Sequence, residues 1–269
     1  MLKKPPAQDA PVAQSLNANA TMLGPGSDIR NEPEIIISQV NESHTLMFNK
    51  YCIHPSQLLL LTLDSYRRQH EALNTADFTA LKSVLEALQT PHYAFFNCSE
   101  HAGASRQHKH MQIFPRDRQD AGSGSSSAIV GNNSIDASKV KLFIEHRNAD
   151  SLPKPPFTYF LHRFSWSELP ESPNQLPPVT ELLAVYTNLL GKCRSVFGVA
   201  EGELVPHNMV VVQEWMMLIP RTSAGYKGLY SNAAGMLGMV WISDQETADR
   251  WIKVGPATVL TELGVKIGE

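Results

Sequence analysis

The residues best suited to chemistry in this 269-residue chain are His108, His110 and Gln112. They alternate along 108–114, which we predict to be a β-strand, and alternate residues of a strand project from the same face. Lys109 would point to the opposite face. A neutral imidazole is a competent nucleophile near pH 7, and a glutamine amide can donate to a phosphoryl oxygen without titrating. The pattern therefore predicts attack by a histidine on a phosphate ester.

Small residues precede this strand. Ala102, Gly103, Ala104 and Ser105 would let backbone N–H groups approach an anion closely, which suits a phosphate. An isolated His-x-His pattern is more often a strand with two hydrogen-bonded histidines beside a turn than an active site. On these residues alone, both interpretations stay open.

The stretch GASRQHKHMQ, residues 103–112, resembles the active-site strand of the histidine triad superfamily. The resemblance is to its transferase branch, which carries His-x-His-x-Gln, and in particular to the fungal diadenosine tetraphosphate phosphorylases, also called ATP adenylyltransferases. Other segments resemble that family in the same order along the chain. They are an Asn-Lys strand at 46–50, a strand ending in asparagine at 93–97, a late hairpin at 207–221 and a following strand at 235–239.

The resemblance implies a role for each matched residue. His110 would carry a covalent adenylyl group, His108 would orient the site, and Gln112 would donate to the α-phosphate in the transition state. The residues implied in substrate binding are Asn49, Lys50, Asn97, Gly103, Ala104, Ser105, Arg106, Asn208, Trp215, Met217 and Arg221. Core packing is an alternative role for Trp215 and Met217, and a solvated surface position is an alternative for Lys50 and Arg106.

The implied reaction cleaves diadenosine tetraphosphate with inorganic phosphate to ADP and ATP through an adenylyl-histidine. A related dinucleotide hydrolase, a hexose-1-phosphate uridylyltransferase and a catalytically weak nucleotide-binding protein are alternatives. The hydrolase branch carries a third histidine where this chain has Gln112, which weighs against it. The other histidines lack acidic or cysteine partners at metal-ligand spacing, so we expect no catalytic metal and no other cofactor.

The elements that must position these residues form an α+β pattern. We expect strands at 34–40, 45–50, 57–62, 93–98, 108–114, 139–145, 157–164, 208–212, 215–220 and 235–242, and helices at 74–89, 179–197, 244–252 and 256–263. The resemblance implies that they build a histidine-triad-like antiparallel sheet with flanking helices.

The domain prediction is a single catalytic unit, 34–269, after a flexible leader at 1–33 that has too few large apolar residues to order itself. Two half-repeats, 34–116 and 139–269, would complete one nucleotide site. The Gly/Ser/Asn-rich segment 117–138 between them is expected to be a flexible loop.

Composition limits the partners and the compartment. The net charge of −3 and the pI near 6.4 argue against a broad nucleic-acid or membrane surface. The three cysteines have no metal-site spacing and favour reduced thiols, and no apolar run approaches the length of a membrane span. We therefore expect no nucleic-acid or membrane partner and a location in the cytoplasm or nucleus. The resemblance implies an adenine dinucleotide or mononucleotide and inorganic phosphate as partners of a monomer or homodimer.

Overall fold

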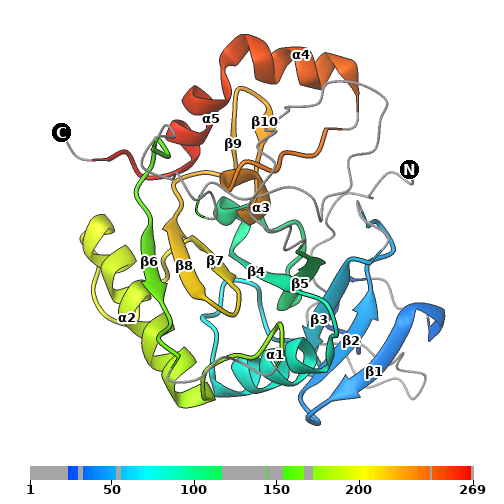
Figure 1. Ribbon diagram of the computed structural model, residues 1–269. Helices are drawn as coiled ribbons and strands as arrows, with labels where there is room; N and C mark the ends of the chain where they lie inside the picture. The colour runs from blue at the N-terminus through cyan, green and yellow to red at the C-terminus, as the bar shows by residue number, and fades with distance from the viewer. Residues whose placement is uncertain are drawn as a thin grey trace.

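An antiparallel sheet forms the centre of the molecule (Figure 1). The computed structural model describes residues 24–29, 33–52, 56–116, 144, 154–166, 172–242 and 244–267. Within these ranges the sheet has eight strands, and every neighbouring pair runs antiparallel. Their spatial order is β1 (Ile36–Val40), β2 (His44–Phe48), β3 (Leu58–Thr62), β5 (His110–Pro115), β4 (His92–Cys98), β7 (His207–Val211), β8 (Trp215–Pro220) and β6 (Phe160–Arg163).

Helices cover both faces of the sheet, α1 (Thr75–Ala87) and α2 (Val179–Phe197) on one, and α3 (Ala233–Met236), α4 (Gln245–Val254) and α5 (Pro256–Leu263) on the other. β4 pairs with β7, so the two halves of the chain share one sheet. The expected α+β class, with an antiparallel sheet and flanking helices, is confirmed.

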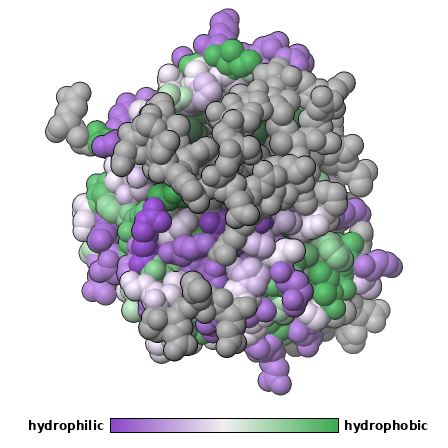
Figure 2. All heavy atoms as spheres, in the orientation of Figure 1, coloured by the Kyte–Doolittle hydropathy of each residue, from purple (hydrophilic) through white to green (hydrophobic). Residues whose placement is uncertain are grey.

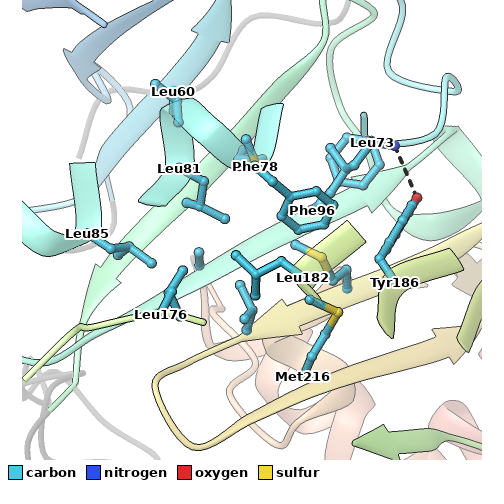
Figure 3. Close-up of a cluster of buried hydrophobic side chains, with 14 of the residues drawn as sticks. Leu60, Leu73, Phe78, Leu81, Leu85, Phe96, Leu176, Leu182, Tyr186 and Met216 are labelled. Carbon is cyan, nitrogen blue, oxygen red and sulfur yellow. Dashed lines mark hydrogen bonds between the residues drawn. The ribbon is translucent and has the colours of Figure 1, made fainter. Parts of the chain in front are cut away.

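The larger core cluster packs α1 and α2 against the sheet (Figure 3). α1 begins where Asn74 and Asp77 exchange side-chain and backbone hydrogen bonds, a capping box that satisfies N–H groups at the helix start. Phe78 of α1 meets Tyr186 of α2 edge to face, with ring centroids 5.5 Å apart. The Tyr186 hydroxyl also accepts a hydrogen bond from the Leu73 N–H at 3.2 Å, so the polar end of this buried ring is satisfied.

The opposite face carries two separate apolar clusters. One lies under α3, α4 and α5 and includes Phe95 and Phe114, and the smaller one includes Leu59 and Leu61 of β3. His110 and Gln112 of β5 lie on this face between the two clusters, since Leu61 pairs with His110 and Leu59 with Gln112. Their side chains are described in the next subsection.

The predicted strand at 235–242 is wrong. The chain forms α3 at Ala233–Met236, because the Asn232 side chain accepts a hydrogen bond from the Gly235 N–H and starts a helical turn. Gly238 follows with a φ of +100°, which a strand does not accommodate. A short hairpin of β9 (Gly225–Tyr226) and β10 (Leu229–Tyr230) precedes α3 and was not predicted.

Three predicted segments fall wholly or partly outside the described residues. They are most of the strand at 139–145, the loop at 117–138, and residues 1–23 and 30–32 of the leader. Residues 24–29 of that leader lie against the stretch that precedes β5, as the hydrogen bonds below show.

On the face shown in Figure 2, hydrophilic residues form a band across the centre, and smaller hydrophobic areas lie toward its left and right edges. Among the helices that the structure describes, none is both long enough and apolar enough to span a membrane.

Candidate functional site

His110 has one defined tautomer. Its Nδ1 lies 2.8 Å from the backbone carbonyl oxygen of His108. A carbonyl oxygen only accepts, so Nδ1 must carry the proton, and the lone pair of the neutral ring resides on Nε2. The side chain is buried, with 6% of its surface exposed. Nε2 is therefore the atom of this ring that could attack an electrophile.

His108 uses both ring nitrogens in the interior. Nε2 lies 2.9 Å from the carbonyl oxygen of Thr62, and Nδ1 lies 2.8 Å from Ser27 Oγ. Burial lowers the pKa of His108, although the Thr62 carbonyl opposes this effect. The Asp28 carboxylate accepts hydrogen bonds from the backbone N–H groups of Gln107 and His108, at 2.8 and 3.0 Å. His108 is thus a neutral residue that ties the segment before β5 to its surroundings.

Gln112 is half-buried on the same face as His110, and its amide has a defined orientation. Gln57 Nε2 donates to Gln112 Oε1 at 3.0 Å. With its oxygen held in this way, Gln112 keeps the N–H groups of its amide for an acceptor such as a phosphoryl oxygen. Gln57 was not predicted to belong to the site, and only the pairing of β3 with β5 brings it there.

A second residue that the sequence did not reveal holds the backbone of His110. Gln69 Oε1 accepts from the His110 N–H at 2.7 Å, and Gln69 Nε2 donates to the His110 carbonyl oxygen at 2.9 Å and to that of Asn97 at 3.0 Å. Gln69 is 3% exposed. All three contacts are interior hydrogen bonds, which are costly to lose.

The loop between β4 and β5 has a constrained backbone. Gly103 has a φ of +83°, and a Cβ atom at this position would lie 2.5 Å from the Ser231 carbonyl oxygen. Ser99 has φ 77° and ψ 168°, a region that is costly for any residue with a side chain. The Ser99 hydroxyl is buried and has no hydrogen-bond partner within the part of the chain that the structure describes. Such strain persists only where the surroundings enforce it, and it is common at functional sites.

Asn97, Asn208 and Arg221 form one buried network beneath this loop. Asn208 Nδ2 donates to Asn97 Oδ1 at 2.8 Å and to the Ala102 carbonyl oxygen at 2.7 Å, while Arg221 donates to Asn208 Oδ1 at 2.6 Å. The Ala233 N–H also donates to Asn97 Oδ1, at 2.9 Å. These residues therefore fix the loop relative to α3.

Arg221 has no exposed surface, and its other hydrogen bonds go to backbone carbonyl oxygens of Ala102, Leu263, Ser223 and Ser231. Burial lowers the pKa of Arg221 to about 9, so the guanidinium stays charged at pH 7. The network places a positive charge behind the loop that was expected to bind phosphate.

The remaining predicted substrate-binding residues occupy three kinds of position. Ala104 and Arg106 are half-buried and Ser105 is exposed in the loop itself. Asn49 and Lys50 are half-buried after β2, where the Asn49 side chain accepts from the Tyr51 N–H at 3.0 Å. Trp215 and Met217 lie in the apolar core with 2% and 0% of their surface exposed, the alternative position that we considered for them.

Lys109 lies on the opposite face from the two histidines, as predicted. Its Nζ is 2.7 Å from Asp77 Oδ2 and 2.8 Å from the carbonyl oxygen of Ala72. His44 Nε2 lies 3.1 Å from the other oxygen of Asp77. Although burial alone would raise the pKa of Asp77, the bond from His44 and the charge of Lys109 hold it below its ordinary value. This ion pair supports the strand from behind and is remote from the chemistry.

Within the described ranges, no three or more His, Cys, Asp or Glu residues come together in an arrangement that could hold a metal ion. The histidine face presents the His110 ring, with its lone pair on Nε2, and the oriented amide of Gln112, whereas both ring nitrogens of His108 are bonded in the interior. The His110 ring and the Gln112 amide suit nucleophilic attack and hydrogen-bond donation to an anionic oxygen.

Two family models match the chain. Residues 20–125 match the Ap4A phosphorylase N-terminal domain, and residues 153–266 match the ATP adenylyltransferase C-terminal domain. Two proteins of Saccharomyces cerevisiae are similar in sequence. Diadenosine 5',5'''-P1,P4-tetraphosphate phosphorylase 2 is 26% identical over 222 residues, which cover 76% of this chain, and Protein APA1 is 24% identical over 220 residues, which cover 77%. In each case this chain spans 63% of the length of the relative.

Solved structures share the fold. Yeast Ap4A phosphorylase Apa2, solved in complex with AMP, superposes with a TM-score of 0.67 at 21% identity, covering 88% of this chain and 80% of Apa2. The structure of Apa2 in complex with Ap4A gives the same TM-score and identity over 89% and 80% of the two chains.

Proposed function

Since this chain belongs to the family of Ap4A phosphorylases and ATP adenylyltransferases, we propose that it transfers an adenylyl group from diadenosine tetraphosphate to inorganic phosphate through a covalent intermediate on His110. The observation that carries the proposal is the hydrogen bond from His110 Nδ1 to the His108 carbonyl oxygen. It leaves the lone pair on Nε2 of a ring that shares one sheet face with Gln112.

In the first half-reaction, His110 Nε2 attacks the phosphorus atom that bears one adenosine. A nitrogen–phosphorus bond forms, the bond from that phosphorus to the bridging oxygen breaks, and ATP leaves with the bonding electrons. In the second, an oxygen of inorganic phosphate attacks the same phosphorus, the nitrogen–phosphorus bond breaks, and ADP leaves. The histidine thus replaces one difficult displacement by two easier ones.

The other residues stabilise charge on the phosphoryl oxygens. The Gln112 amide, oriented by Gln57, donates to one of them. The N–H groups of Gly103 and Ala104 donate to the carbonyl oxygens of Glu100 and Ser99, so the phosphate contact of this loop is assigned to Ser105 and Arg106. Gly103 is required in the loop because a side chain would strike the Ser231 carbonyl oxygen. The buried charge of Arg221 adds a favourable potential behind the loop.

Ligand contacts are therefore assigned to the surface of the loop, with Ala104, Ser105 and Arg106, and to Asn49 and Lys50 beyond β2. Asn97, Asn208 and Arg221 act from beneath by fixing the loop. Trp215 and Met217 act only as core residues, because their side chains are enclosed.

The test is the dependence of the products on phosphate. Incubation with diadenosine tetraphosphate and phosphate should give equal amounts of ADP and ATP, and a His110→Asn variant should give neither at a measurable rate. Release of AMP that does not require phosphate would instead identify a hydrolase. Tight nucleotide binding without turnover would identify a binding protein and refute the proposed reaction.

A further inference from the structure

The backbone pairing of β4 with β5 ends just before it reaches Asn97 and His110. The pairing runs from His92 opposite Pro115 to Phe95 opposite Gln112 and stops there. In the same register, two residues further on, Asn97 would stand opposite His110. The side chain of Gln69 lies between them instead, because it bonds to the backbone of both.

The amide of Gln69 fits this gap in one orientation only. Its oxygen meets the His110 N–H, and its nitrogen meets the carbonyl oxygens of His110 and Asn97. The reverse orientation would place the NH₂ group against an N–H and the oxygen against two carbonyl oxygens, which leaves every contact unfavourable. The amide therefore satisfies three backbone groups that would otherwise be buried without partners.

The backbone of Gln69 is tied to the segments on either side of the loop. Its N–H donates to the Gln107 carbonyl oxygen at 2.7 Å, and its carbonyl oxygen accepts from the Ser99 N–H at 3.1 Å. The Ser99 carbonyl oxygen in turn accepts from the Ala104 N–H at 3.2 Å. One residue thus connects the backbone of the nucleophile to the strained start of the phosphate loop.

We infer that Gln69 is a positioning residue for the adenylyl transfer, which sets the separation between His110 and the loop that receives the phosphate. This inference rests on the proposed function. Removing the amide lets β5 move toward β4 or leaves three polar backbone groups unsatisfied, and either change shifts the imidazole relative to the phosphorus. A displacement of about 1 Å in such a site slows the reaction roughly 100-fold.

Two variants and one matched control test the inference. Gln69→Leu removes all three hydrogen bonds, whereas Gln69→Glu keeps the shape and the acceptor for the His110 N–H but turns a carboxylate oxygen toward two carbonyl oxygens. Gln213→Leu is the control. Gln213, in the turn between β7 and β8, is also buried, and its amide donates to the Ser172 carbonyl oxygen. The turn lies near the Pro115 end of β5, at the opposite end of that strand from His110.

The first readout is the rate of adenylyl-enzyme formation in a single turnover without phosphate, together with the affinity for AMP. Both Gln69 variants should form the adduct about 100-fold more slowly while AMP binding changes less than about threefold. Gln213→Leu should react at the wild-type rate even if its thermal stability falls. If Gln69→Leu does not fold, the isosteric Gln69→Glu decides, and a wild-type rate in either folded variant overturns the inference.

The second readout does not depend on turnover. Histidine-labelled protein should show one Nδ1–H tautomer for His110 in nitrogen NMR spectra of the wild type and of Gln213→Leu, and a tautomer mixture in the Gln69 variants. An unchanged His110 signal in those variants overturns the positioning role. A wild-type protein that forms no adduct refutes the proposed function instead, which separates the two failures.

Discussion

The most informative single substitution behind the active strand is Lys109→Met. Lys109 stands between the two histidines in the sequence, and a lysine there invites a catalytic interpretation. The structure places its ammonium on the opposite face, 2.7 Å from Asp77 Oδ2, with 1% and 2% of the two side chains exposed. Methionine keeps most of the side-chain length and the apolar contacts but removes the charge.

The loss of stability expected for Lys109→Met follows from the buried carboxylate of Asp77 that loses its cationic partner. Asp77 would stay buried with His44 and its own capping bond as partners but without the ammonium. Removing one partner of a buried ion pair costs about 3–5 kcal/mol. For a chain of this size, 1 kcal/mol corresponds to roughly 2–4 °C in Tm, so the expected loss is on the order of 6–20 °C.

Thermal unfolding and adenylyl-enzyme formation should be measured on the same samples. Lys109→Met should lower the Tm within that range, and the folded variant should still form the adduct within about threefold of the wild-type rate, since the lysine does not face the phosphate. Adding Asp77→Asn should recover part of the stability because no unpaired charge remains. Lys266→Met is the control, since Lys266 pairs with Glu262 at the surface. This substitution should lower the free energy of unfolding by less than about 1 kcal/mol.

Two results would contradict this account of Lys109. A Tm unchanged by Lys109→Met would show that the ion pair contributes nothing. A loss of more than about 100-fold in the rate of a folded variant would show that the lysine takes part in the chemistry.

Three further outcomes are expected. Burial lowers the pKa of His207 to about 4, so between pH 6.5 and 4 the unfolded chain binds a proton at this residue that the folded chain does not. This difference should lower the free energy of unfolding by about 3 kcal/mol over that window, and His207→Gln should remove that contribution in urea titrations while the contribution of His108 remains. Gly103 has a φ of +83° and lies against the Ser231 carbonyl oxygen. Gly103→Ala should therefore lower the free energy of unfolding by about 1–3 kcal/mol and raise KM. An unchanged KM would show that the loop does not contact the substrate. Gln57→Leu removes the hydrogen bond that orients the Gln112 amide. It should lower kcat roughly tenfold with little change in AMP affinity. An unchanged kcat would refute the orienting role of Gln57.

The parts of the site that the sequence reveals are those governed by local periodicity. The alternation from His108 to Gln112 predicts which side chains share a face, and the opposite placement of Lys109 is confirmed by its contact with Asp77. The start of α1 is likewise local, because the Asn-x-x-Asp spacing at Asn74 builds the capping box within one helical turn.

The parts that the sequence does not reveal depend on contacts between distant residues. Gln69 and Gln57 lie 41 and 55 positions from their partners in β5, and nothing in their own neighbourhoods marks them. The error at 235–242 has a similar origin. Apolar residues there satisfy a strand pattern, but the Asn232 cap and the packing of α3 against β4 and β7 select a helix instead.

The burial of Arg221 was equally hidden from the sequence. An arginine in a late hairpin suggests a direct contact with phosphate, yet all the donors of this guanidinium point to carbonyl and amide oxygens of the protein. Only the fold shows that its charge lies beneath the loop.

The most direct test of the whole account is to locate the covalent intermediate. The protein is incubated with diadenosine tetraphosphate in the absence of phosphate, digested, and examined by tandem mass spectrometry. The account predicts a mass increase of one AMP on the peptide that contains residues 107–112, with the modification at His110, and its disappearance when phosphate is added. An adduct on His108 or on another residue, or turnover without any adduct, would contradict the assignment of His110 Nε2 as the nucleophile.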